Sequence, residues 1–262
     1  MKMTINSIRD ETLARLKTCW AEMAFIVMLA AGVVCFTYAV LLFLAQVMGI
    51  HSTYYVLPLF DELPLYYVIP AAVMILIVYI GSIPLFFGIR WFYWHLSGGA
   101  VMSIDSVFAP YDSRRMIRRC IAVRLITDLR KLLRLAVFGA VGYASVFALI
   151  HVTGTNERTI MSVATFIIFI LLVLYYVSVM DLAFVPYIFA DNPDLPVSEI
   201  MKRSKEAIRS RMSFSVNLFF SCLPWYLATF FVFPLMFVLP ITNVLHAIYL
   251  RHINEEKDEK AA

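Results

Sequence analysis

The sequence predicts an all-α protein, a polytopic helical membrane protein with about six transmembrane helices in three hairpins. Long charge-free runs are the first observation: residues 23–60, 63–89, 135–156, 159–180 and 212–250 contain no Lys, Arg, Asp or Glu. About 20 apolar residues suffice for one helical crossing of the hydrocarbon core. Apolar residues make up 62% of the chain and charged residues 15%, more apolar surface than a soluble fold could cover.

The runs are apolar on every face, which excludes the alternating pattern of a β-barrel strand. Helices then satisfy all backbone polar groups within each segment. We expect one membrane domain over residues 21–252, after an amphipathic segment at 1–20 and before a charged tail at 253–262. Its spans are predicted at about 21–48, 65–91, 134–152, 159–186, 214–232 and 235–250, with cytoplasmic basic segments at 92–133 and 187–213.

The distribution of basic residues predicts the orientation. Lys and Arg concentrate in the segments before the first span, between the second and third, between the fourth and fifth, and after the last. The connections 49–65 and 152–158 hold Arg158 alone. Because cytoplasmic loops carry the excess of Lys and Arg, we expect both termini in the cytoplasm.

The last predicted hairpin has little length to spare. If 212–250 were helical throughout, it would reach about 58 Å at about 1.5 Å per residue, barely two crossings. Pro234 marks the expected turn, because proline removes a backbone donor. The alternative is one span followed by a re-entrant segment, which would place the acidic residues at 255–259 outside.

A basic amphipathic helix is predicted over Val197–Met212. Apolar side chains fall on one side of its helical wheel and basic ones on the other, with Arg211 alone against the pattern. We expect its apolar side to face the membrane and its basic side to meet anionic headgroups. The alternative is that these charges serve topology alone. The candidate anionic-lipid contacts are Arg114, Arg115, Arg118, Arg119, Lys202, Arg203, Lys205 and Arg209.

Two further features of the cytoplasmic side are predicted. The stretch Arg114–Arg134 carries charges on opposite helical faces, so we expect a break, or a turn out of the interface, near Ala122. The aromatic residues at 91–94 are expected to anchor the second span at the headgroup level. Nucleic acid is not an expected partner, because a basic stripe beside a bilayer already has anionic lipid within reach.

Polar residues at membrane depth are the default candidates for function, because burying an unpaired charge there is costly. We predict that Asp181, on the fourth span, and Arg90, on the second, neutralise one another; the alternative is a proton or ion site. Asn217, Asn243 and His246 lie on the last two spans. Interhelical hydrogen bonding is the commoner role for such groups, and a substrate pathway is the alternative.

No enzyme motif is found. The chain has no GxSxG, HExxH or phosphate-binding glycine loop, and its cysteines (Cys19, Cys35, Cys120 and Cys222) are far apart. We therefore predict no catalytic, cofactor-binding or metal-binding residue and no cofactor.

The stretch Tyr187–Tyr249 resembles an uncharacterised family of bacterial integral membrane proteins, domain of unknown function 975. The resemblance rests on YIFADNP at 187–193, Ser198-Glu199, Ser204, the span beginning Ser221–Trp225, and the ending Pro240 with Ala247-x-Tyr249. Upstream, Gly88–Arg90 and Phe108 resemble its middle section. Ile241 departs from the family pattern, as does the lack of glycines between the last two spans.

The resemblance implies a bacterial plasma-membrane protein and supplies no catalytic or binding residue. A remoter similarity, to the membrane portion beside some glycerophosphodiester phosphodiesterase domains, implies association with envelope lipids. Our leading hypothesis is a non-enzymatic module that associates with anionic lipids, a partner membrane protein or another copy of itself. The alternative is a transporter or channel for a lipid or hydrophobic compound, and an intramembrane enzyme comes third.

Overall fold

The computed structural model describes residues 4–47, 65–100, 102–153, 157–222, 224 and 235–261. These residues are helical almost throughout and form no strand, which confirms the predicted all-α class. Four of the helical segments are long and apolar enough to cross a membrane. They are Trp20–Val47, Val68–Ser97, Arg114–His151 and Met161–Asp191.

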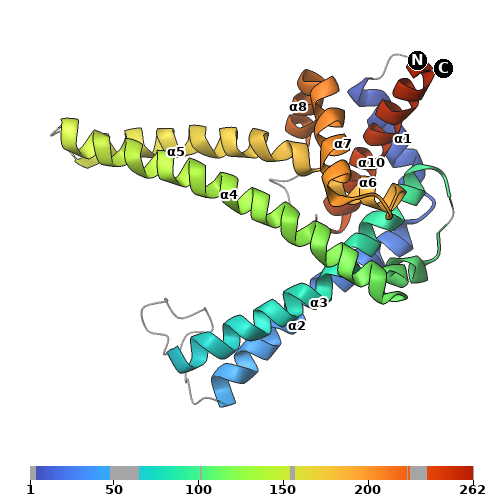
Figure 1. The fold of residues 1–262 in the computed structure, drawn as a ribbon, viewed down its shortest axis with the longest axis horizontal. Coiled ribbons are helices and arrows are strands. Elements are labelled where there is room, and N and C mark those ends of the chain that lie inside the picture. The colour runs from blue at the N-terminus through green and yellow to red at the C-terminus, as the bar shows by residue number, and fades with distance from the viewer. Residues whose placement is uncertain are drawn as a thin grey trace. The chain divides into compact units, whose positions relative to one another are not determined.

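The helices follow one another in the order shown in Figure 1. They are α1 (Ile5–Leu16), α2 (Trp20–Val47), α3 (Leu65–Ser97), the 3-10 helix η2 (Ile104–Tyr111), α4 (Arg114–Thr153), α5 (Glu157–Val179), the 3-10 turn η3 (Met180–Leu182), α6 (Val185–Asp191), α7 (Val197–Ser210), α8 (Met212–Ser221) and α10 (Leu235–Ala261).

The first four predicted spans correspond to helices. The spans at 21–48 and 65–91 match α2 and α3, and those at 134–152 and 159–186 fall within α4 and within α5 with its continuation. Most of the predicted connection 49–65, the middle of 152–158, residues 223 and 225–232 of the fifth span and the expected turn at Pro234 lie outside the described residues.

The sixth predicted span lies in α10, but its environment is not that of a lipid-facing helix. Nearly every side chain from Val244 to Leu250 is buried within the protein, and α10 is not among the four segments suited to crossing a membrane. The helix also continues to Ala261 through the predicted tail. The total of six spans therefore stays a prediction.

The chain divides into two compact units, each described here by itself. Unit 1 comprises residues 1–121 and 224–249, and unit 2 comprises 122–223 and 250–262. In unit 1, α3 packs against α1, α2 and η2. In unit 2, α7 packs against η3, α6 and α8.

The close approach of α3 to η2 organises unit 1. A Cβ atom added to Gly88 would lie only 1.8 Å from the backbone oxygen of Val107, so this helix position has room for glycine alone. Near the other end of η2, the Tyr111 hydroxyl donates a hydrogen bond to the Gly81 carbonyl at 2.7 Å. Partial burial raises the pKa of Tyr111.

A second glycine, Gly99, fixes the turn after α3. Gly99 adopts a φ of +81°, a backbone conformation that side-chain-bearing residues rarely adopt. A Cβ there would also lie 2.5 Å from Nη1 of Arg15. The α3 terminus is therefore shaped to accept the Arg15 side chain of α1.

The aromatic residues at 91–94 are not the interfacial anchor predicted from sequence. They belong to α3, and Phe92, Tyr93 and Trp94 are buried inside the protein. The prediction failed because the same amphipathic rings also suit a packed core. A sequence run alone does not distinguish a lipid interface from a protein interior.

The predicted break near Ala122 is also absent, since α4 is one continuous helix from Arg114 to Thr153. The chain has neither Pro nor Gly between Arg114 and Phe138 to interrupt it. Asp128 instead bridges charges along the helix, to Arg124 at 2.7 Å and to Lys131 at 3.7 Å. Charges on two faces are tolerated because both faces are partly exposed there.

Candidate functional site

The basic amphipathic helix predicted from sequence is α7. It starts after Pro196, whose extended backbone precedes the first turn, with Glu199 in the first turn and Arg209 in the last. Each of these charges interacts favourably with the helix dipole. Each interaction stabilises the helix by a few tenths of a kcal/mol to about 1 kcal/mol. Its buried side chains recur at helical spacing on one face: Ile200, Met201, Ser204, Ala207 and Ile208.

The apolar face of α7 is covered by protein, which corrects the expectation that it faces lipid. It packs against η3 and α6, whose own side chains Leu182, Phe189 and Ala190 are buried. An apolar helical face is satisfied equally by a lipid surface or by a neighbouring helix, and the sequence pattern is the same for both. Packing of this face holds α7 within unit 2.

The opposite face of α7 is exposed and mainly basic. Lys202, Arg203, Lys205 and Arg209 are all exposed, and Arg203 pairs with Glu199 one turn earlier at 3.1 Å. Among the described residues, the other three take part in no ion pair. Glu206 also lies on this face, so three unpaired positive charges stand beside one negative charge.

Arg211, which sat against the amphipathic pattern, has a separate role. Its Nη2 atom lies 2.7 Å from Oε1 of Glu256 on the C-terminal part of α10, within unit 2. This pair ties the end of α7 to the chain's last helix. The basic residue is therefore oriented by a partner distant in sequence.

A polar cluster of Arg134, Asp181 and Ser204 joins three elements of unit 2. The guanidinium of Arg134 on α4 forms a bidentate pair with Asp181 of η3, with Nη2 donating to Oδ2 at 2.9 Å. Arg134 also donates to the Ser178 backbone carbonyl at the end of α5. The fully buried Ser204 hydroxyl of α7 donates to the Asp181 carbonyl at 2.6 Å.

The partner of Asp181 in the structure is Arg134, where the sequence predicted Arg90. Arg90 belongs to unit 1 and is half-buried on α3 with interactions of its own. Arg134 was missed because it was counted among the residues that set topology. A signal was present in the sequence: Arg134 and Asp181 each lie one full span from the same short connection, 152–158, so a hairpin brings them to one level.

The remaining candidate polar residues do not form a common site. Asn243 and His246 are both buried on α10 in unit 1, consistent with the shared face predicted for them. Asn217 is exposed on α8 in unit 2. Of the basic residues at the start of α4, Arg114, Arg115 and Arg118 are exposed and Arg119 is half-buried.

Metal ligands are not gathered anywhere in the part of the chain that the structure describes. No group of three or more His, Cys, Asp or Glu residues is placed there to hold an ion. The four cysteines are free thiols, with Cys120 and Cys222 buried.

Comparison with known proteins adds no assignment: no family model, no curated protein and no solved structure matches the chain. The function is therefore argued from the residues themselves.

Proposed function

We propose that the protein is a non-enzymatic membrane module of the bacterial plasma membrane that associates with anionic lipids through the exposed basic face of α7. The observation that carries the proposal is that the two faces of this helix have different surroundings. Its apolar face is packed on η3 and α6, and its basic face is exposed. The helix is thus held by protein contacts, so its charges are available for a partner.

The position of α7 in unit 2 supports this proposal. Ser204 joins it to Asp181, at the end of the apolar helix α5, and Arg134 joins the same residue to α4. With both termini in the cytoplasm, this end of the hairpin lies at the cytoplasmic surface, where anionic headgroups gather. Each basic residue there contributes about 1 kcal/mol of attraction. A membrane-protein partner with an acidic face is the alternative occupant.

The test uses the full-length protein reconstituted in bilayers of phosphatidylcholine and phosphatidylglycerol. Electron spin resonance of a spin-labelled lipid measures how strongly the protein selects the anionic lipid over the neutral one. We expect the triple variant Lys202→Gln, Lys205→Gln, Arg209→Gln to lose several-fold of this selectivity, and added salt to reduce it in the wild type.

A control variant on the same face should change the lipid selectivity in the opposite direction. Glu206→Gln removes the negative charge and is expected to raise the selectivity slightly. If the triple variant matched the wild type at low salt, the basic face would not be a lipid contact. Proteoliposome flux abolished by Asp181→Asn in a stably folded protein would favour the transporter instead.

A further inference from the structure

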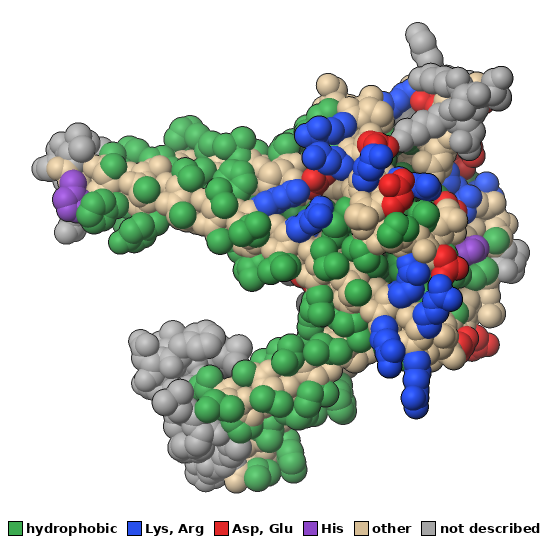
Figure 2. Space-filling view, in the orientation of Figure 1, with side chains coloured by type: hydrophobic (Ala, Val, Ile, Leu, Met, Phe, Trp, Pro, Cys, Tyr) green, Lys and Arg blue, Asp and Glu red, His purple; other side chains and the backbone are tan. Residues whose placement is uncertain are grey.

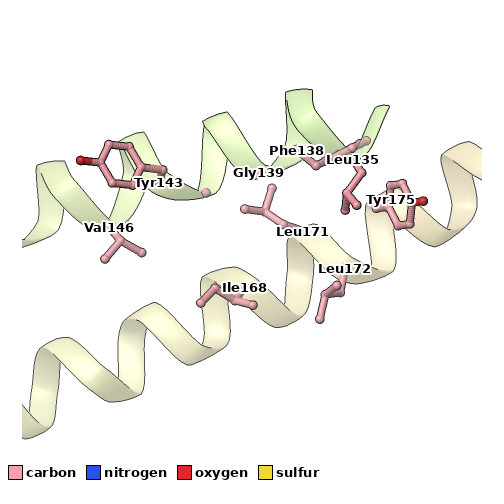
Figure 3. Close-up of a pocket in the computed structure, with 10 residues that line it drawn as sticks. Leu135, Phe138, Gly139, Tyr143, Val146, Ile168, Leu171, Leu172 and Tyr175 are labelled. Atoms are coloured by element: carbon pink, nitrogen blue, oxygen red, sulfur yellow. The ribbon is translucent and has the colours of Figure 1, made fainter. Parts of the chain in front are cut away.

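An apolar cavity of about 370 Å³ lies between α4 and α5 in unit 2. Figure 3 shows the residues that line it on the two helices, with Leu135 and Tyr175 toward one end and Tyr143 and Val146 toward the other. Volumes of about 300 Å³ and above are typical of ligand sites. Its lining is hydrocarbon and aromatic ring almost throughout, so it offers a water molecule few of the polar partners it needs.

Two glycines of α4 create this cavity. At Gly142 the helices are close, because an added Cβ would lie 3.1 Å from Cδ1 of Leu171. At Gly139, one turn earlier, an added Cβ would meet nothing within 4 Å. The two helices are therefore close together at Gly142 and leave space between them at Gly139.

The surroundings of the cavity are those of a membrane span. Exposed apolar side chains such as Val137, Val141, Phe166 and Phe169 cover both helices, and Figure 2 shows hydrophobic side chains along the length of this hairpin. In a bilayer, the molecules next to these helices are lipid acyl chains. An acyl chain is thus the chemical species that fits both the shape and the lining.

Two basic residues, Lys131 and Arg134, stand at the Leu135 end of the cavity. Lys131 lies one helical turn before Leu135, on the same side of α4, and its side chain is 37% exposed beside Asp128. Arg134 is adjacent, and its guanidinium has more N–H donors than its three contacts to Asp181 and Ser178 use. Basic groups between transmembrane helices are suited to phosphate headgroups.

We propose that the cavity between α4 and α5 binds one acyl chain of an anionic phospholipid, whose phosphate contacts Lys131 and Arg134. The inference rests on the proposed function in placing this hairpin in the membrane. It adds a defined site, separate from the surface contacts of α7, that retains a single lipid. Phe138 and Tyr175, edge to face with ring centroids 6.1 Å apart, mark the end of the cavity nearest the cations.

The test is native mass spectrometry of the full-length protein in mild detergent with equal amounts of phosphatidylglycerol and phosphatidylcholine. The wild type is expected to retain one phosphatidylglycerol. Gly139→Leu fills the cavity from a position with no steric conflict, and its retained lipid should fall about tenfold, because the leucine displaces lipid methylenes. Ala144→Leu, on the exposed opposite side of α4, should retain lipid as the wild type does.

The headgroup contact has its own variant. Lys131→Gln should reduce the preference for phosphatidylglycerol over phosphatidylcholine several-fold while lipid retention itself persists. Circular dichroism of each variant verifies that the helices are intact. The triple α7 variant should keep its retained lipid, which separates this site from the proposed surface contact.

Three results would overturn the inference. One is unchanged retention in Gly139→Leu, and another is equal retention of the two lipids by the wild type. The third is a dimer of the chain that Gly139→Leu dissociates, because the cavity would then accept a helix of a second copy.

Discussion

The two long helices α3 and α4 have similar apolar stretches and different environments. In α3, 33% of the residues in its most apolar window are buried inside the protein, against 0% in α4. The difference comes from η2, whose backbone approaches Gly88 directly, whereas the apolar part of α4 has α5 beside it and a glycine-made cavity between them. A long apolar helix can thus be closely packed by protein, as α3 is, or leave its apolar stretch exposed, as α4 does.

The largest expected effect is on the packed side of this comparison. Gly88→Ala places a methyl group where the Val107 carbonyl oxygen lies 1.8 Å away. Because backbone must move to relieve this clash, we expect a loss of about 3 kcal/mol in the free energy of unfolding. Titration of the detergent-solubilised protein with denaturing detergent measures it.

Gly81→Ala is the matched control on the same helix, since a Cβ there meets nothing within 4 Å. It should leave stability unchanged or raise it by up to about 1 kcal/mol through lower backbone entropy of the unfolded chain. Equal losses in the two variants would mean that α3 is not closely packed against η2.

The second largest expected loss of stability comes from the ion pair that joins Arg134 of α4 to Asp181 after α5. Arg134 and Asp181 have side chains only 29% and 21% exposed, so removing either partner leaves a poorly solvated charge. Fully buried pairs lose about 3–5 kcal/mol on such a change, and for this partly exposed pair we expect about 2 kcal/mol for Asp181→Asn or Arg134→Gln. The double variant should lose less than the sum.

The partner predicted from sequence provides the comparison. Arg90→Gln combined with Asp181→Asn should give additive losses in the same unfolding measurement, because Asp181 is bound by Arg134. Coupling of Asp181 to Arg90 and additivity with Arg134 would reverse the assignment.

The smallest expected effect is at the junction of α7 with this hairpin. Ser204→Ala removes the hydrogen bond to the Asp181 carbonyl and should cost about 1 kcal/mol. Ser210→Ala, which removes only a local bond to Ala207 within α7, should change stability by less than about 0.5 kcal/mol. Hydrogen exchange of α7 should rise in the first variant and not in the second.

Part of the candidate site could be read from sequence. The basic and apolar faces of α7 were predicted correctly, since periodicity is a property of one segment. Asp181 was recognised as a charge at the end of an apolar run. Its partner was not, and nothing in the sequence indicated that Ser204 is its other contact.

The sequence by itself determined that the chain is helical and where α2 and α3 begin. It predicted six spans, and the first four lie on helices long and apolar enough to cross a membrane. These follow from the length and composition of contiguous runs, which a helix converts directly into a span. Only the tertiary structure decided that α7 packs its apolar face on protein, that residues 92–94 are buried and that Arg134 binds Asp181. Those outcomes depend on how each helix is rotated about its axis and how closely distant backbones approach, as at Gly88 and Val107, and no single segment encodes them.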